Sequence, residues 1–362
     1  MKILIFHRSH EHDIKFGKIK SDIDNTLSKD TPSYSYNIAL KNLGYEVKNL
    51  IFPRFYKISY SKNLVGRALI KIQREYINFF RRLEFIRKFK KLISNFNPEI
   101  IFMASHFRGI KPSYLKKLKK KYGFKVVIMN GLALKHGTSW DKDFSKIVDM
   151  NALINDSQVK EFKKAGANNP IKIPITGCAN EIHKDQNYVD KTKYLYDVGF
   201  VGSLDNHWYK NRTEILKNLT NFNLGIWSIN NTFVKNDSKL SKFYQGSVSR
   251  SQAPSIYRKC KIIINIHGQH VYNDLPGGGN LSLFEIPASG GFQIVDMYSR
   301  DWFEEGKEIV SFSDIEDLKK KIQYYLNNPT ERKNIAEAGR KRALNEHTFE
   351  KRFEKIFKHL DL

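Results

Sequence analysis

Short apolar runs alternate with longer mixed segments along the whole chain. In the first half, the apolar runs predict strands at residues 2–6, 46–51, 99–103, 125–129 and 152–154. The mixed segments between them predict helices, and Thr31 and Pro32 give the first helix an N-cap and a proline at its first position. Strands that alternate with helices are typical of a parallel sheet. The first half therefore predicts a Rossmann-like domain.

The second half repeats this arrangement. Apolar runs there predict strands at residues 197–201, 223–226, 262–266, 293–296 and 309–312. A chain of 362 residues exceeds the usual size of one domain, so we expect two α/β domains. We place them at residues 1–176 and 177–345, with a linker near residues 174–184. Residues 346–362 predict a final helix that can return to the first domain.

The segment from Pro276 to Gly291 carries the clearest candidate chemistry. Three consecutive glycines precede a short predicted helix, and such a backbone can approach a diphosphate closely while the first helical turn offers free N–H groups. Glu285, one turn into that helix, can accept two hydroxyl hydrogen bonds from a ribose or a hexose. The loop also follows a predicted strand, at the sheet edge where ligands collect in α/β proteins. The pattern indicates a nucleotide-sugar site, and the alternative is a surface loop with a solvated Glu285.

The residues of this region resemble the C-terminal half of GT-B glycosyltransferases, and most of all the CgeB-like subgroup with a family 1-type C-terminal domain. The resemblance is carried by residues 261–267, Gly279 and Asn280, and residues 284–293, and it extends over residues 197–357. It implies two Rossmann-like domains that face each other across a cleft. The first would hold the acceptor and the second the nucleotide-sugar donor. Many members carry two glutamates with seven residues between them; Glu285 matches the second, and Gly277 stands at the first.

We expect the donor site to lie in the second domain. Gly202 and Ser203 follow its first strand and should face the diphosphate, and Lys210 and Arg212 could supply positive charge to a leaving UDP or GDP. The alternative for these two cations is a surface pair, and residues 247–252 could line the base pocket. The full set of expected donor-binding residues is Gly202, Ser203, Lys210, Arg212, Tyr257, His267, Gly278, Gly279, Asn280, Leu281, Ser282 and Glu285.

Candidate catalytic residues come from the loops of the first domain. A histidine can take a proton from an acceptor hydroxyl. His106, directly after the strand at 99–103, is the first candidate and His7 the second. Other polar residues that follow these strands are Arg8, His10, His12, Arg108, His136 and Asp141.

We expect no metal ion and no cofactor besides the UDP- or GDP-sugar substrate. Asp22 with Asp24, and Asp141 with Asp143, have the spacing of a metal-binding pair, but that spacing is common by chance. The resemblance implies that basic side chains, backbone amides and a helix dipole neutralise the leaving diphosphate instead. Cys178 and Cys260 show no zinc or disulfide pattern, which suits a reducing cytoplasm.

The formal net charge of +25 is the remaining strong signal. Residues 67–92 alternate basic with aromatic and aliphatic side chains, as a helix at an anionic membrane or along a phosphate backbone does, although a solvated helix face has the same pattern. We therefore expect a cytoplasmic protein that can associate with the inner face of the membrane and glycosylate a glycolipid or surface polysaccharide. Two alternatives stay open: glycosylation of hydroxymethylated DNA bases, and a non-catalytic nucleotide-binding or spore-coat assembly protein.

Overall fold

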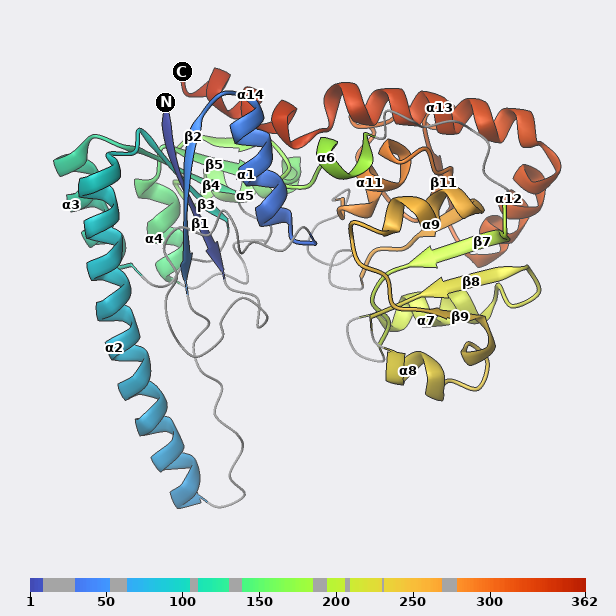
Figure 1. Cartoon of the computed structure of the whole chain (residues 1–362), viewed down its shortest axis with the longest axis horizontal. Coiled ribbons are helices and arrows are strands. Elements are labelled where there is room, and N and C mark those ends of the chain that lie inside the picture. The colour runs from blue at the N-terminus through green and yellow to red at the C-terminus, as the bar shows by residue number, and fades with distance from the viewer. Residues whose placement is uncertain are drawn as a thin grey trace. The chain divides into compact units, whose positions relative to one another are not determined.

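A computed structural model describes residues 1–8, 30–52, 64–104, 110–129, 139–184, 194–205, 209–229, 231–268 and 279–362 (Figure 1). These residues form two compact units. Unit 1 comprises the described parts of residues 1–28, 40–152 and 160–171, and unit 2 those of residues 29–39, 153–159 and 172–362. Each unit is built around its own six-stranded sheet, with strand orders β2-β1-β3-β4-β5-β6 and β12-β11-β10-β7-β8-β9.

The sheet of unit 1 is parallel from β2 through β5. Its strands are β1 Lys2–Arg8, β2 Glu46–Phe52, β3 Ile100–Ala104, β4 Lys125–Met129, β5 Met150–Leu153 and β6 Pro170–Lys172. Its helices are α2 Leu64–Phe96, α3 Pro112–Tyr122 and α4 Ser139–Ile147, with α1 Pro32–Asn42 and α5 Asp156–Lys164 shared between the units. The predicted Rossmann-like arrangement is confirmed.

Helix α2 divides its aromatic residues between the core and the surface. Phe85 and Phe89 are fully buried, and the Phe89 ring packs edge-on against Phe6 of β1 at 4.8 Å between centroids. Phe79 and Phe80, two turns earlier, are 55% and 51% exposed. The apolar face predicted for residues 67–92 is therefore not one continuous surface patch, because its C-terminal part belongs to the core.

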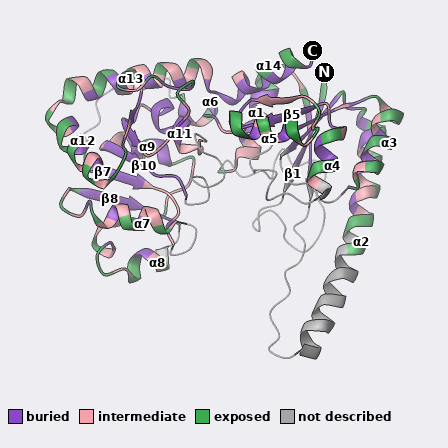
Figure 2. Ribbon diagram, turned by 180° about the vertical axis from the view of Figure 1, so that it is seen from behind, coloured by how far each residue is buried: buried purple, intermediate pink, exposed green. Residues whose placement is uncertain are grey.

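The sheet of unit 2 is parallel, and its inner strands β8, β10 and β11 consist almost entirely of buried residues, drawn in purple in Figure 2. Such strands read as continuous apolar runs, which is why β10 was predictable from the sequence. The strands are β7 Tyr196–Val201, β8 Leu224–Trp227, β9 Tyr244–Gly246, β10 Cys260–Asn265, β11 Gln293–Val295 and β12 Val310–Ser311. The helices are α6 Asn180–His183, α7 Lys210–Lys217, α8 Asn231–Asn236, α9 Ala253–Lys259, α11 Ser282–Ala288, α12 Ile315–Asn327, α13 Pro329–Glu346 and α14 Phe349–His359.

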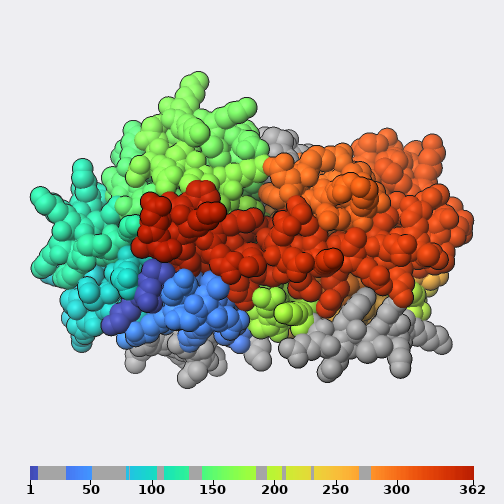
Figure 3. All heavy atoms as spheres, turned by 90° about the horizontal axis from the view of Figure 1, so that it is seen from above, coloured from blue at the N-terminus to red at the C-terminus, as the bar shows by residue number. Residues whose placement is uncertain are grey.

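The C-terminal helices lie on the outside of the molecule, where Figure 3 shows α13 and α14 in red. Helix α14 belongs to unit 2, and its Phe349 ring packs edge-on against Tyr36 of α1, which lies in the part of α1 that also belongs to unit 2. The segment predicted as a linker, residues 174–184, is likewise part of unit 2. There Cys178 exchanges backbone hydrogen bonds with His347 and Phe349.

Two possible features are not found among the residues that the structure describes. No described helix is both long and apolar enough to cross a membrane. The same residues bring together no group of three or more His, Cys, Asp or Glu side chains that could hold a metal ion.

Candidate functional site

A network of side-chain amides fixes the start of α11 against the carboxyl end of β10. Asn280 donates to Asn265 Oδ1 at 2.8 Å, and Asn265 in turn donates to Gln293 of β11 at 3.2 Å. The Asn280 Oδ1 atom accepts from the backbone N–H of Leu283 at 2.9 Å. The backbone N–H of Leu283, one of the groups expected to be free for a diphosphate, is therefore already bound by Asn280. Helix α11 has only seven residues.

His267 fixes the backbone at Asn280, just before α11. It is fully buried, and its Nδ1 lies 2.6 Å from Oδ1 of Asp296. Its Nε2 accepts a hydrogen bond from the backbone N–H of Asn280 at 3.2 Å, so the proton of the neutral ring is on Nδ1. His267 thus orients the loop that precedes α11, with both ring nitrogens in use.

Gly279 packs too closely for any other residue. A Cβ atom there would lie 2.7 Å from side-chain atoms of Leu283 and of Trp302. Gly279 is therefore required for packing within unit 2, and the expected close approach of the glycine backbone to a diphosphate stays a prediction. Gly278 lies outside the described residues.

Arg212 connects the loops that follow β7 and β10. Its Nε donates to the carbonyl of Ile266 at 2.7 Å and its Nη1 to the carbonyl of Ser203 at 3.0 Å, while the guanidinium stacks on the ring of Tyr209. Lys210, two residues earlier, is exposed. Arg212 and Lys210, which we expected to act together on the diphosphate, therefore have different surroundings. Arg212 binds backbone carbonyls of the site, and Lys210 is exposed to solvent.

Glu285 is buried rather than solvated, with 4% of its surface exposed. Its Oε1 accepts from Nε of Arg250 at 2.6 Å and lies 3.5 Å from Nε2 of His183. Burial alone would raise the pKa of Glu285, but His183 and the Arg250 guanidinium hold it below its usual range. The carboxylate is therefore ionised, oriented and kept from bulk water, which excludes the simple solvated-residue alternative.

His183 reaches Glu285 through a second contact as well. Its Nδ1 lies 3.0 Å from Oγ of Ser289, and that hydroxyl donates to the backbone carbonyl of Glu285 at 2.7 Å. Since the hydroxyl proton is committed, Nδ1 of His183 must be the donor. Its Nε2 is buried and faces Oε1 of the carboxylate at 3.5 Å.

Arg250 is anchored at its other end by the start of α1. Its Nη1 donates to Oγ of Ser35 at 2.8 Å and lies 3.4 Å from the carbonyl of Thr31. The neighbouring Ser251 donates to Asp30 through both its backbone N–H and its hydroxyl. Arg250 lies within residues 247–252, which we expected only to line a base pocket, and neither Arg250 nor His183 was predicted as a partner of Glu285.

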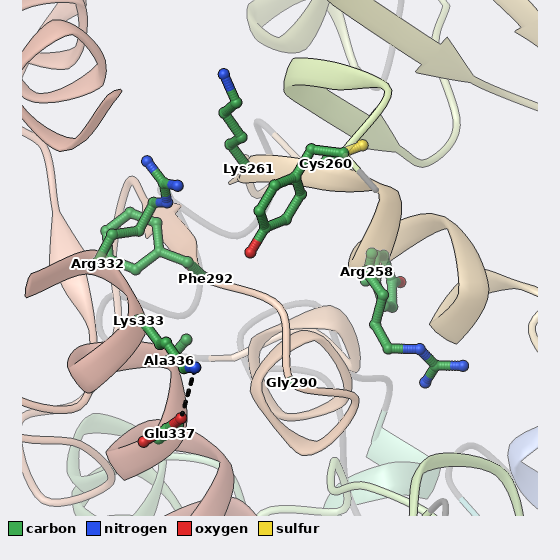
Figure 4. A pocket seen from close by; sticks show the side chains of 11 residues that line it. Arg258, Cys260, Lys261, Gly290, Phe292, Arg332, Lys333, Ala336 and Glu337 are labelled. Carbon is green, nitrogen blue, oxygen red and sulfur yellow. Dashed lines mark ion pairs between the residues drawn. The ribbon is translucent and has the colours of Figure 1, made fainter. Parts of the chain in front are cut away.

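Tyr257 of α9 is buried and lies near Ser282 at the start of α11. Burial raises the pKa of Tyr257. It also contributes to a pocket at the opposite edge of the sheet, where β10 begins (Figure 4). That pocket is otherwise lined by Tyr194, Arg258, Cys260, Lys261, Gly290, Phe292, Arg332, Lys333, Ala336 and Glu337. Because ligands of parallel sheets bind at the carboxyl ends of the strands, we do not assign this pocket to the donor.

The candidate catalytic residues lie outside the part of the chain that can be described at side-chain level. His106, His10, His12, His136 and Arg108 fall in undescribed segments. His7 is the residue of β1 that pairs with Ile51 of β2, and its side chain is likewise not described. The assignment of an acceptor base stays a prediction.

Comparison with known proteins agrees with this architecture. Residues 210–358 match the family model described as glycosyl transferase-like. No curated protein sequence matches the chain. The fold is similar to a glycosyltransferase from Rickettsia africae (TM-score 0.66, 13% identity, 99% of this chain and 97% of the other). It is also similar to sucrose-phosphate synthase from Thermosynechococcus elongatus (0.63, 11%, 99% of each chain) and to HepE from Anabaena in complex with UDP-glucose (0.57, 11%, 100% and 99%).

The fold and these matches define the class of the protein as GT-B, with two parallel α/β sheets of six strands each. Within that class, residues 210–358 are similar to the glycosyl transferase-like family. The resemblance to GT-B glycosyltransferases is confirmed, and the CgeB-like subgroup stays a prediction.

Proposed function

We propose that this protein is a glycosyltransferase that moves a sugar from a nucleoside-diphosphate sugar, such as a UDP- or GDP-sugar, to a hydroxyl group. The observation that carries the proposal is the state of Glu285. Its two described partners, Arg250 and His183, both contact Oε1, so Oε2 is available to a ligand hydroxyl. A buried, ionised carboxylate with one oxygen available, at the ligand-binding edge of a parallel sheet, suits a ribose.

The surroundings of Glu285 supply the rest of a donor site. The Gly279 and Asn280 backbone lies one turn before the carboxylate, and its position is fixed by His267 and Asn265. In the transfer, the bond between the sugar carbon and the diphosphate oxygen breaks and a bond to the acceptor oxygen forms. The acceptor proton leaves to a base, and we expect Lys210, whose side chain is exposed, to approach the leaving diphosphate.

The test is a titration of the full-length protein with UDP, GDP and ADP by calorimetry, followed by an assay of donor-sugar hydrolysis. We expect saturable binding of one or two nucleotides and slow release of sugar from the matching donor. Binding without any hydrolysis or transfer would favour the non-catalytic alternative. No binding of any nucleoside diphosphate would refute the proposal.

We propose further that the acceptor is presented at an anionic membrane surface, as a glycolipid or a growing polysaccharide. On α2, Phe79, Phe80 and Leu83 are each about half exposed. Exposed cations lie beside them and further along the helix, namely Arg82, Arg87, Lys90 and Lys91. Aromatic side chains with neighbouring cations suit the headgroup region of an anionic bilayer.

Sedimentation with vesicles that contain phosphatidylglycerol tests the acceptor surface. Changing Arg82, Lys90 and Lys91 to glutamine should weaken binding by about two orders of magnitude, since each basic residue near the surface contributes roughly 1 kcal/mol. The matched control changes three exposed lysines of unit 2, Lys239, Lys307 and Lys320, to glutamine. Equal loss in both variants, or binding to duplex DNA but not to vesicles, would contradict a membrane role for α2.

A further inference from the structure

The contact between Arg250 and Glu285 uses only half of what the guanidinium offers. A guanidinium presents Nε–H and Nη2–H side by side, as a fork that matches the two oxygens of a carboxylate. Here Nε donates to Oε1 of Glu285 at 2.6 Å, but Nη2 is buried without a hydrogen-bond partner. A buried donor without a partner is costly, and such groups in native structures call for an explanation.

The orientation of Arg250 is fixed by contacts that have no role in ion pairing with Glu285. Ser35 and Thr31 hold Nη1, and the guanidinium carbon lies 5.9 Å from the centre of the Phe349 ring. The side chain of Arg250 is only 9% exposed. The unpartnered Nη2 therefore keeps its position on the same side as Nε, next to the carboxylate.

We propose that Arg250 is a specificity-determining residue for the ribose of the donor nucleotide. It fixes the Glu285 carboxylate through Oε1, so that Oε2 accepts a hydrogen bond from one ribose hydroxyl. Its Nη2 donates to the oxygen of the neighbouring hydroxyl. The pair thus recognises two vicinal hydroxyl groups, as one acceptor and one donor, and this proposal rests on the proposed nucleotide-sugar function.

This arrangement predicts discrimination against 2′-deoxyribose. A 2′-deoxynucleotide lacks one of the two hydroxyl groups and leaves one charged group of the pair without its partner. Loss of a hydrogen bond to a charged group lowers affinity about tenfold to a hundredfold. Ser35 of α1 and Thr31, just before α1, contribute to this specificity because they hold Nη1 of Arg250 in place.

The experiment compares UDP with 2′-deoxy-UDP by calorimetry on the full-length protein, or GDP with 2′-deoxy-GDP if GDP is the nucleotide that binds. The wild type should prefer the ribonucleotide at least tenfold. Arg250→Gln should reduce this preference to less than threefold, mainly by lowering the affinity for the ribonucleotide. Arg250→Lys retains the charge but lacks the fork, so it should also lose the preference, and it serves if Arg250→Gln does not fold.

The matched control is Arg332→Gln. Arg332 is another buried arginine of unit 2, held by the carbonyl of Tyr325, and it lies on α13 at the pocket of Figure 4. Its replacement should lower the melting temperature and leave the preference for ribose unchanged. An unchanged preference in both Arg250 variants, or a wild type that binds both nucleotides equally, would overturn the assignment of Arg250. A wild type that binds neither nucleotide would instead overturn the proposed function.

Discussion

Protonation of His347 should destabilise unit 2 in mild acid. This residue is 2% exposed and packs against the rings of Phe284 and Phe303. Its Nε2 donates to the carbonyl of Trp302 at 2.7 Å, and its Nδ1 accepts from Nη2 of Arg352 at 3.1 Å. A second proton on the ring would have to displace the Arg352 hydrogen bond and face that positive charge. Burial and Arg352 accordingly lower the pKa of His347 from 6.5 to about 3.

The magnitude follows from linkage between protonation and folding. Because the folded state has the lower pKa, the unfolded chain takes up this proton first as the pH falls. The stabilisation is fully present above pH 6.5 and is lost progressively toward pH 3, the two pKa values. At about pH 5, this one group should have lowered the free energy of unfolding by about 2 kcal/mol relative to about pH 8.

Chemical denaturation at several pH values, compared between the wild type and His347→Gln, measures this effect. Glutamine can still donate to Trp302 and accept from Arg352 but does not titrate. The difference in unfolding free energy between the two proteins should shift by about 2 kcal/mol in favour of the variant between about pH 8 and pH 5. A difference that stays constant over this range would refute the reasoning, because it would mean that His347 takes up its proton in the folded state as well.

Four further changes test individual residues of the proposed donor site. Glu285→Gln should weaken nucleotide binding by about 1.5–3 kcal/mol in a calorimetric titration, through loss of a charge-assisted hydrogen bond, and unchanged affinity in the folded variant would remove Glu285 from the site. Asn280→Ala should lower both the melting temperature and nucleotide affinity, since the amide holds β10 and α11 together; a change in neither would contradict its role. Arg212→Gln should cost about 1–3 kcal/mol of stability in denaturant melts, whereas Lys210→Gln should leave stability unchanged and weaken only nucleotide binding. Equal effects of the last two changes on stability would contradict the distinct roles assigned to them.

The elements that were predictable from the sequence are those with a strong local signal. Strand β10 is a continuous apolar run because both its faces are covered, and the glycines before α11 mark a close packing that Gly279 confirms. Strands β6 and β9 have three residues each, too few for a recognisable pattern. Their existence depends on pairing at the sheet edges.

The partners of Glu285 could not be predicted, for a different physical reason. Arg250 lies 35 residues from Glu285 in sequence, and its anchor Ser35 lies 215 residues from Arg250. The local pattern of apolar and polar residues carries no information about contacts between residues so far apart in the sequence. The aromatic residues of α2 show the same limit, because spacing alone does not tell Phe89, which reaches the core, from Phe80, which does not.

A crystal structure of the full-length protein with the nucleoside diphosphate that binds it would test the central claim most directly. We expect a ribose hydroxyl within about 3.2 Å of Oε2 of Glu285, with the diphosphate directed toward Gly279. A nucleotide bound elsewhere, with Glu285 still paired only to Arg250 and His183, would contradict the account.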